Sequence, residues 1–324
     1  MDTVYFILQR VFIAFIPLLI VALGGLMTEK SGVANIALEG LMIIGAFTGA
    51  VVIRALQQAE GLNLDNQWIY IIGMIVGGLT GLAFSILHAI ASIRFKADQV
   101  ISATALNISL VALSIFIARI MSGGGGKSIQ FIEPIVPIEK IPLLGDIPFI
   151  GDIFFKQAYI SNFIGFGIFF IVWIILERTK FGKHLKAVGE NPHAAQSVGI
   201  NIYKVRYIGV LSSGFLAGLG GVVFIVSTAG SFEATVAGFG FLAISVLVFG
   251  NWDAPRILLA AYFFALVRTI NQVKSVIPFL RDLPIHSNVY NMLPYITVMI
   301  VLLFFSKRSR SPKALGKIFD QGER

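Results

Sequence analysis

Long apolar segments constrain this chain more than any other feature. Each is long enough for a helix to cross about 30 Å of hydrocarbon, which takes about 20 residues. The segments lie at 5–27, 32–56, 69–93, 99–121, 158–176, 207–229, 257–276 and 288–305. They are apolar on every face, unlike the alternating strands of a membrane barrel. We therefore predict an all-α polytopic membrane protein, one transmembrane domain over 1–324 with about eight to ten transmembrane helices.

Composition supports this class and excludes several kinds of chemistry. Hydrophobic residues make up 56% of the 324 residues and charged residues 13%, whereas soluble domains carry roughly 25% charged residues. The chain has no cysteine, so it forms no disulfide and no thiolate metal site. Its four histidines have no metal-binding spacing, and Asp98 and Asp253 are interpreted as helix caps. We predict no catalytic residues and no metal site.

The distribution of positive charge predicts which loops are cytoplasmic. Lysine and arginine are concentrated in 177–206 and in the tail at 307–324, whereas 57–67 has neither and 122–157 balances three lysines with acidic residues. By the positive-inside rule, the first two segments are cytoplasmic and the other two are extracellular. The net charge of +8 therefore reflects topology and not nucleic-acid binding.

One apolar segment, 32–56, carries a carboxylate, Glu39. A charge at membrane depth normally faces a partner or a wet cavity. Glu39 is expected either to hydrogen-bond to a neighbouring helix or to help shape a translocation path. The side of Met1 also depends on this segment, because a full crossing places Met1 outside and a re-entrant or broken helix places it inside.

Glycines suggest further features of the helices. The runs Gly32 to Gly45 and Gly238 to Gly250 are both glycine-bracketed and resemble each other weakly, which is typical of internal repeats with broken helices in transporters. Glycines also recur every four residues at 73, 77 and 81, and at 214 and 218. This spacing predicts close helix packing.

The loop at 177–206 contains a short helix candidate. Asn191 is a capping residue, Pro192 suits the first turn, and Gly199 ends the helix. Such a helix is too short to cross a membrane. Its basic flanks hold the loop against anionic lipid, or the helix fits a groove in a soluble partner; the residues alone leave both open.

Three segments resemble a known family. GENPHAAQSVGIN at 189–201, EKSGVANIALEGLMIIGAF at 29–47 and FKADQVISATALNI at 95–108 are similar to the permease subunits of bacterial ATP-binding-cassette importers of the simple-sugar and nucleoside branch. The resemblance covers nearly the whole chain and is strongest to permeases of purine nucleoside importers. It implies a multi-pass protein of the bacterial cytoplasmic membrane.

The resemblance also implies partners. The 177–206 loop would carry the coupling helix that docks on a separate ATPase subunit, which binds ATP and Mg, so this chain would need no cofactor of its own. A second, related permease would complete the pore as a heterodimer, and an extracellular substrate-binding lipoprotein would deliver the cargo. The residues assigned to the ATPase contact are Glu190, Asn191, Pro192, His193, Ala194, Ala195 and Gln196.

Cargo contacts are expected in segments that resemble the pore-lining helices of the family, at Asn35, Glu39, Asn107 and Phe239. The predicted function is a nucleoside permease that works by alternating access. The alternatives are a monosaccharide or riboflavin permease of the same family, or a secondary transporter driven by an ion gradient. A Glu39→Gln substitution is expected to be tolerated better by an ATP-driven importer than by an ion-coupled transporter.

Overall fold

The computed structural model describes residues 2–59, 65–123, 126–273, 289, 292–294, 296–300 and 310–320. Six helical spans within these residues are long and apolar enough to cross a membrane, which confirms an all-α polytopic membrane protein. They are α1 (Asp2–Glu29), α2 (Leu38–Gln58), α3 (Asn66–Ala89) with a π-helical turn (Ile90–Arg94), α4 (Gln99–Met121), α5 (Ile160–Arg178), and α8 (Ile202–Phe224) with a π-helical turn (Ile225–Ala229).

Two further helices complete the described part of the membrane domain. α10 (Ala254–Val273) has 20 residues, and α9 (Phe239–Phe249) has only 11, in agreement with the short apolar run in the sequence. The predicted span at 288–305 lies largely outside the described residues, although 289, 292–294 and 296–300 are helical.

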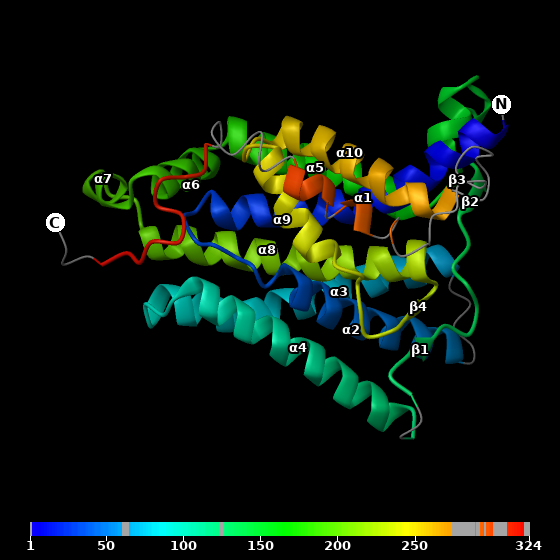
Figure 1. Cartoon of the computed structure of the whole chain (residues 1–324), viewed down its shortest axis with the longest axis horizontal. Helices are drawn as coiled ribbons and strands as arrows, with labels where there is room; N and C mark the ends of the chain where they lie inside the picture. The colour runs from blue at the N-terminus through cyan, green and yellow to red at the C-terminus, as the bar shows by residue number, and fades with distance from the viewer. Residues whose placement is uncertain are drawn as a thin grey trace.

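The two ends of the helix bundle differ (Figure 1). One end carries four short strands in two antiparallel pairs, in which β1 (Ile129–Gln130) pairs with β4 (Ser231–Phe232) and β2 (Ile138–Lys140) pairs with β3 (Lys156–Ala158). The other end carries α6 (Lys180–Glu190), α7 (Pro192–Ser197) and residues 310–320. By the positive-inside rule, we expect the second end, which carries the basic 177–206 loop, to be cytoplasmic.

The start of α1 lies at the outer end. The Nε2 of Gln9 donates a hydrogen bond to the carbonyl of Asp152, in the 122–157 loop, at 2.8 Å. α1 therefore runs inward and ends at the cytoplasmic side, and α2 returns to the outer side (Figure 1). The start of α1 thus lies at the end of the bundle opposite the basic 177–206 loop, and an extracellular N-terminal end of α1 stays a prediction of the positive-inside rule.

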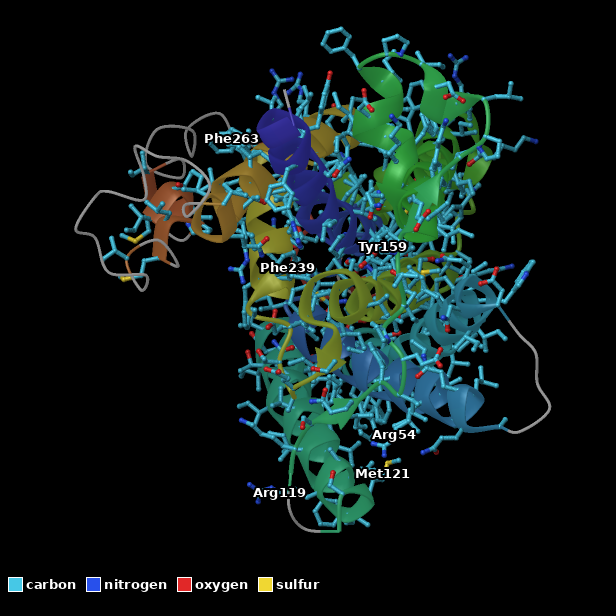
Figure 2. The ribbon with its side chains drawn as sticks, turned by 90° about the vertical axis from the view of Figure 1, so that its right-hand side faces the viewer. Arg54, Arg119, Met121, Tyr159, Phe239 and Phe263 are labelled. Carbon is cyan, nitrogen blue, oxygen red and sulfur yellow. The ribbon has the colours of Figure 1, made fainter. Side chains whose placement is uncertain are left out.

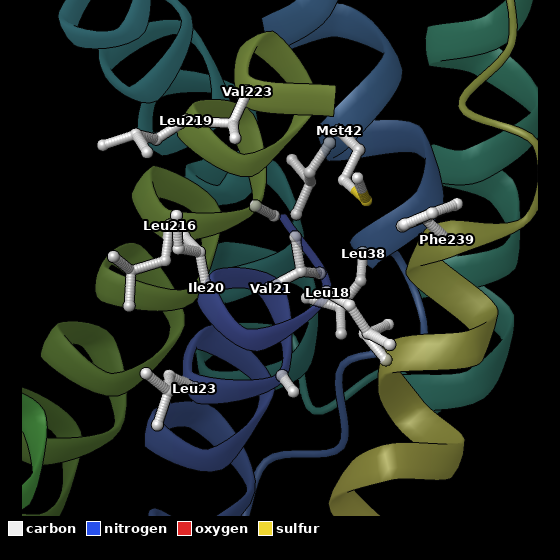
Figure 3. Packing of buried hydrophobic residues seen from close by; sticks show 14 of the residues in the cluster. Leu18, Ile20, Val21, Leu23, Leu38, Met42, Leu216, Leu219, Val223 and Phe239 are labelled. Atoms are coloured by element: carbon white, nitrogen blue, oxygen red, sulfur yellow. The ribbon is translucent and has the colours of Figure 1, made fainter. Parts of the chain in front are cut away.

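α1 forms the centre of the bundle, where it packs against α8, α10, α9 and α5. Figure 3 shows Leu18, Val21 and Leu23 of α1 among Leu38 of α2 and Leu216 of α8. Of the α1 span 94% is buried, compared with 22% of the α4 span. Because lipid is as apolar as leucine, this central position is stabilised by close packing and not by escape from water.

Glycines bring α3 and α8 into backbone contact. A side chain at Gly81 would overlap with the carbonyl oxygen of Gly214, and one at Gly218 would overlap with the carbonyl oxygen of Gly77. The predicted close packing of these glycine stripes is confirmed.

At the outer end, Arg54 of α2 and Met121 of α4 help line a cavity of about 220 Å³ (Figure 2).

Candidate functional site

The chain leaves the helical conformation between α1 and α2, at residues 30–37, which we call the first break. Gly32 has a φ of +85°, which favours glycine. The Oδ1 of Asn35 accepts a hydrogen bond from the amide of Ala37 at 3.0 Å, and its Nδ2 donates to the Oγ of Ser213 in α8 at 3.0 Å. Asn35 therefore starts α2 and ties the break to α8.

Side chains from α3 and α4 replace the helical hydrogen bonds that the first break lacks. The Oε1 of Gln99 accepts from the amide of Ala34 at 2.7 Å, and the Nε2 of His88 lies 3.0 Å from the carbonyl of Ala34. Asn107 accepts from the amide of Gly40 at 2.7 Å and donates to the carbonyl of Ile36 at 2.9 Å. Non-helical backbone inside a membrane needs such partners.

A second break, residues 233–238, precedes α9. Glu39 of α2 binds the start of α9: one carboxylate oxygen accepts from the amide of Gly238 at 3.0 Å and the other accepts from the amide of Gly240 at 2.7 Å. Arg268 of α10 donates to the carbonyl of Ala237 at 3.0 Å, and its guanidinium carbon lies 4.8 Å from the centre of the Phe239 ring. The starts of the two broken helices are thus joined by Glu39.

The two breaks share one hydrogen-bonded turn before the helix that follows. The amide of Ala237 donates to the Oγ1 of Thr235 at 3.0 Å, as the amide of Ala37 donates to Asn35. Aligning these turns places Ala34 opposite Ala234 and Gly40 opposite Gly240. The backbone differs, since Ala237 has a φ of +52° and Ala37 a φ of −75°, and the weak internal repeat expected from the sequence stays a prediction.

The four residues predicted to contact cargo all belong to this region. Asn35, Glu39 and Phe239 are buried, with 1%, 8% and 1% of their surface exposed, and Asn107 is half-buried. The polar groups of Asn35, Glu39 and Asn107 form hydrogen bonds with the backbone of the two breaks. The expectation that Glu39 hydrogen-bonds to a neighbouring helix is confirmed, and a contact of these residues with cargo stays a prediction.

Arg268 is a member of this cluster that the sequence reasoning did not single out. It is an ionisable residue within the apolar run 257–276, and such residues commonly mark functional positions in membrane helices. That signal was sufficient to select Arg268 as a candidate. It was not sufficient to identify Ala237 and Phe239 as its contacts, because they lie on another element.

The coupling loop, residues 177–206, contains the predicted short helix as α7. The Oδ1 of Asn191 accepts a hydrogen bond from the amide of Ala194 at 3.1 Å, and Pro192 occupies the first helical turn. Gly199 has a φ of +84° just beyond the helix. The predicted cap, start and end are confirmed. The sequence reasoning did not separate α6, which precedes α7 after a bend at Asn191.

The seven residues assigned to the ATPase contact do not all face outward. Glu190, Asn191, His193 and Ala194 are exposed, and Pro192 and Gln196 are half-buried, whereas Ala195 is 3% exposed. Val198 was not among the seven, although 75% of its surface is exposed.

A polar cavity of about 320 Å³ lies between the coupling loop and the turn that joins α9 to α10. Lys30, Glu190 and Asp253 contribute to its wall, and Lys186 forms an ion pair with Glu177 across 2.6 Å. Burial, followed by repulsion from Lys186, lowers the pKa of Lys30 below its usual value. The cavity therefore brings charges of the coupling loop next to the first break.

Comparison with known proteins identifies the family. A family profile described as "Branched-chain amino acid transport system / permease component" matches residues 7–303. The chain belongs to this permease family. The permease is 40% identical over 310 residues to "Guanosine ABC transporter permease protein NupQ" of Bacillus subtilis, which covers 95% of this chain and 94% of that relative.

Two further relatives extend the comparison. The permease is 35% identical to "Nucleoside ABC transporter permease protein NupC" of Lactococcus lactis, over 97% of this chain and 96% of the relative. It is 25% identical to "Guanosine ABC transporter permease protein NupP" of Bacillus subtilis, over 94% of this chain and 82% of the relative. Bacillus subtilis therefore has two guanosine permeases that resemble this chain to different degrees.

Proposed function

We propose that this permease forms the membrane path of an ATP-driven nucleoside importer in the bacterial cytoplasmic membrane. The observation that carries the cargo assignment is the 40% identity to a guanosine permease over 95% of this chain. The observation that supports ATP coupling is α7, a capped and exposed helix at the end of the bundle opposite the outer loop. The permease performs no chemistry of its own.

The partners follow from this function. An ATPase subunit, which binds ATP and Mg, docks on α7 and on exposed Val198. A second, related permease completes the pore, and the two guanosine permeases of Bacillus subtilis support a pair of unlike subunits. An extracellular substrate-binding lipoprotein docks at the outer end, near β1 to β4.

The two broken helices are the parts of the fold best suited to move in alternating access. α2 and α9 are joined at their starts by Glu39, and α9, with 11 residues, is shorter than a regular span. Cargo passes close to Asn35, Glu39, Asn107 and Phe239 in this proposal. Tight binding is not required of these residues, because the external binding protein supplies the affinity.

The geometry of Glu39 gives no support to ion coupling. An ion-coupled transporter needs carboxylate oxygens that bind the ion. Both oxygens of Glu39 instead accept backbone hydrogen bonds from the start of α9. Glu39 therefore has a structural task that does not depend on the energy source.

Uptake of labelled guanosine tests the function. Cells that carry the permease and its partners are compared with cells that lack the permease, with ATP depletion and a protonophore applied separately. We expect uptake to require the permease and ATP and to resist the protonophore. Uptake that stops with the protonophore alone would instead identify an ion-coupled transporter. Guanosine uptake that is unchanged in cells that lack the permease would contradict the nucleoside assignment and leave a monosaccharide or riboflavin as the cargo.

The docking role of α7 gives a second test. Ala194→Trp places a bulky ring on the exposed face of α7, so we expect the ATPase to dissociate while the permease stays folded. Ala195→Trp is not suitable, because Ala195 is buried and the ring would disrupt the loop itself. Co-purification of the ATPase measures docking, and Ala194→Ser, which keeps a small side chain, is the matched control. Full co-purification with Ala194→Trp would contradict the assignment.

A further inference from the structure

Residues 310–320, which we call the strap, cross the coupling loop at the cytoplasmic end (Figure 1). The amide of Ala314 donates a hydrogen bond to the carbonyl of Gly189, at the end of α6, at 2.9 Å. Two residues later, the amide of Gly316 donates to the carbonyl of Gly32, in the first break, at 3.2 Å. One short segment thus bonds both to the coupling loop and to the entrance of α2.

Phe319 is the main side-chain contact of the strap. It is 3% exposed, and its ring centre lies 5.2 Å from that of His193 on α7 and 5.9 Å from that of Tyr203 on α8. The guanidinium carbon of Arg206 lies 5.8 Å from the centre of the same ring. Phe319 therefore lies between the short helix and the start of α8.

Arg206 is buried with few hydrogen-bond acceptors, so the Phe319 ring is one of its main contacts. Only 2% of Arg206 is exposed, and its Nη1 donates to the carbonyl of Lys317 at 3.4 Å. Its Nε and Nη2 have no hydrogen-bond acceptor among the residues that the structure describes. A buried guanidinium with few acceptors gains from an aromatic face.

Both ends of the strap contact other cytoplasmic turns. The amide of Arg310 donates to the Oδ1 of Asn251, just after α9, at 2.6 Å. Asp320 forms an ion pair with Lys96, in the turn between α3 and α4. The strap therefore contacts the coupling loop, the entrance of α2, the exit of α9 and the α3–α4 turn.

We propose that the strap is a mechanical link that carries movement of α7 to the two broken helices, and that Phe319 is the residue that positions α7 on it. The proposal rests on the proposed function of the permease. α7 has only six residues and cannot by itself reach α2 or α9. Coupling between sites requires an element that contacts both, and the strap joins them through hydrogen bonds at Gly189, Gly32 and Asn251.

The test uses the complete transporter with Phe319→Ala. We expect the amount of co-purified ATPase to stay normal and the uptake per ATP hydrolysed to fall about two- to thirtyfold, the range expected when one contact in a coupling network is removed. Phe319→Tyr keeps the ring and should keep the normal ratio. Ile318→Ala is the matched control, because Ile318 is the adjacent residue and is 51% exposed.

A second variant covers the case in which Phe319→Ala misfolds. Gly316 has a φ of +76° and open space around its α-carbon, so Gly316→Ala strains the bond to Gly32 without creating a cavity. We expect it to lower uptake per ATP as well. A normal ratio in both variants would overturn the proposal, as would loss of the ATPase, since the strap would then be a docking surface. Failure of the proposed function is distinguishable, because the unmodified permease would then show no ATP-dependent uptake.

Discussion

Glu39 shows why a carboxylate is kept at membrane depth in this permease. The start of a helix has free amide groups and a partial positive charge, and a carboxylate with two accepting oxygens satisfies both. Glu39 accepts from Gly238 and from Gly240, and Arg268 lies on the other side of the same turn. The cost of burying the charge is thereby offset by the helix end that it binds.

Glu39→Gln tests this role. The amide of glutamine has one accepting oxygen and one donating nitrogen, so one backbone amide of α9 loses its acceptor and faces a donor. We expect the stability of the permease to fall by about 1–3 kcal/mol, the cost of an unsatisfied buried donor. Thermal unfolding in detergent measures the change. From the sequence, we expected this variant to separate ATP-driven from ion-coupled transport. The contacts of Glu39 change that expectation, because the damage is structural in both cases.

Ser245→Ala is the matched control for Glu39→Gln. Ser245 lies on the same short helix, and its exposed hydroxyl bonds only to the carbonyl of Phe241 within α9. Its removal should leave the unfolding temperature unchanged. Equal stability of Glu39→Gln and Ser245→Ala would show that the carboxylate does not hold α9.

At the scale of the element, contact between α3 and α8 depends on the absence of side chains. Gly77 and Gly81 face Gly214 and Gly218, and the backbones approach closely enough for each glycine to contact a carbonyl oxygen of the other helix. Small residues are the usual means of close helix contact in membranes. The same interface supports α2, since a side chain at Gly45 would overlap with the backbone of Gly218.

Gly218→Val should separate these helices. The added methyl groups meet the backbone of Gly77, which cannot move without shifting α3, so we expect a loss of about 1–3 kcal/mol of stability or more. Thermal unfolding and the yield of folded permease measure the effect. Gly167→Val on α5 is the control, because nothing lies within 4 Å of a side chain added there. An equal effect of the two variants would contradict the interface.

At the scale of the whole molecule, the two broken helices enter the bundle from opposite ends. The first break follows α1 at the cytoplasmic end, and the second break follows β4 at the outer end (Figure 1). Their helices therefore point away from a common meeting point at Glu39. This arrangement requires that the start of α1 be extracellular.

Labelling of single cysteines tests this topology. The chain has no cysteine, so Val4→Cys and Val198→Cys each introduce a unique thiol. Both positions are exposed, at 56% and 75%. We expect a membrane-impermeant maleimide to label Val4→Cys in intact cells and Val198→Cys only after permeabilisation. Labelling of both in intact cells, or the reverse order, would contradict the orientation.

Local features of the sequence by themselves determined the helical class, the basic cytoplasmic loop and the short helix α7. Their causes lie within a few residues: apolar runs of membrane length, and the cap of Asn191, the position of Pro192 and the turn at Gly199. A broken helix within 32–56 was one of the two interpretations that the sequence left open. The family resemblance extended this to the assignment of α7 as an ATPase contact.

Only the tertiary structure decided the partner of Glu39, the contacts of Arg268, the end of the bundle at which α1 begins and the path of the strap. The contact of Glu39 with Gly238 joins residues 199 positions apart, and that of Lys96 with Asp320 joins residues 224 apart. No periodicity or spacing encodes such pairs. They arise when apolar helices pack, because each buried polar group must then find whichever partner the packing brings within reach.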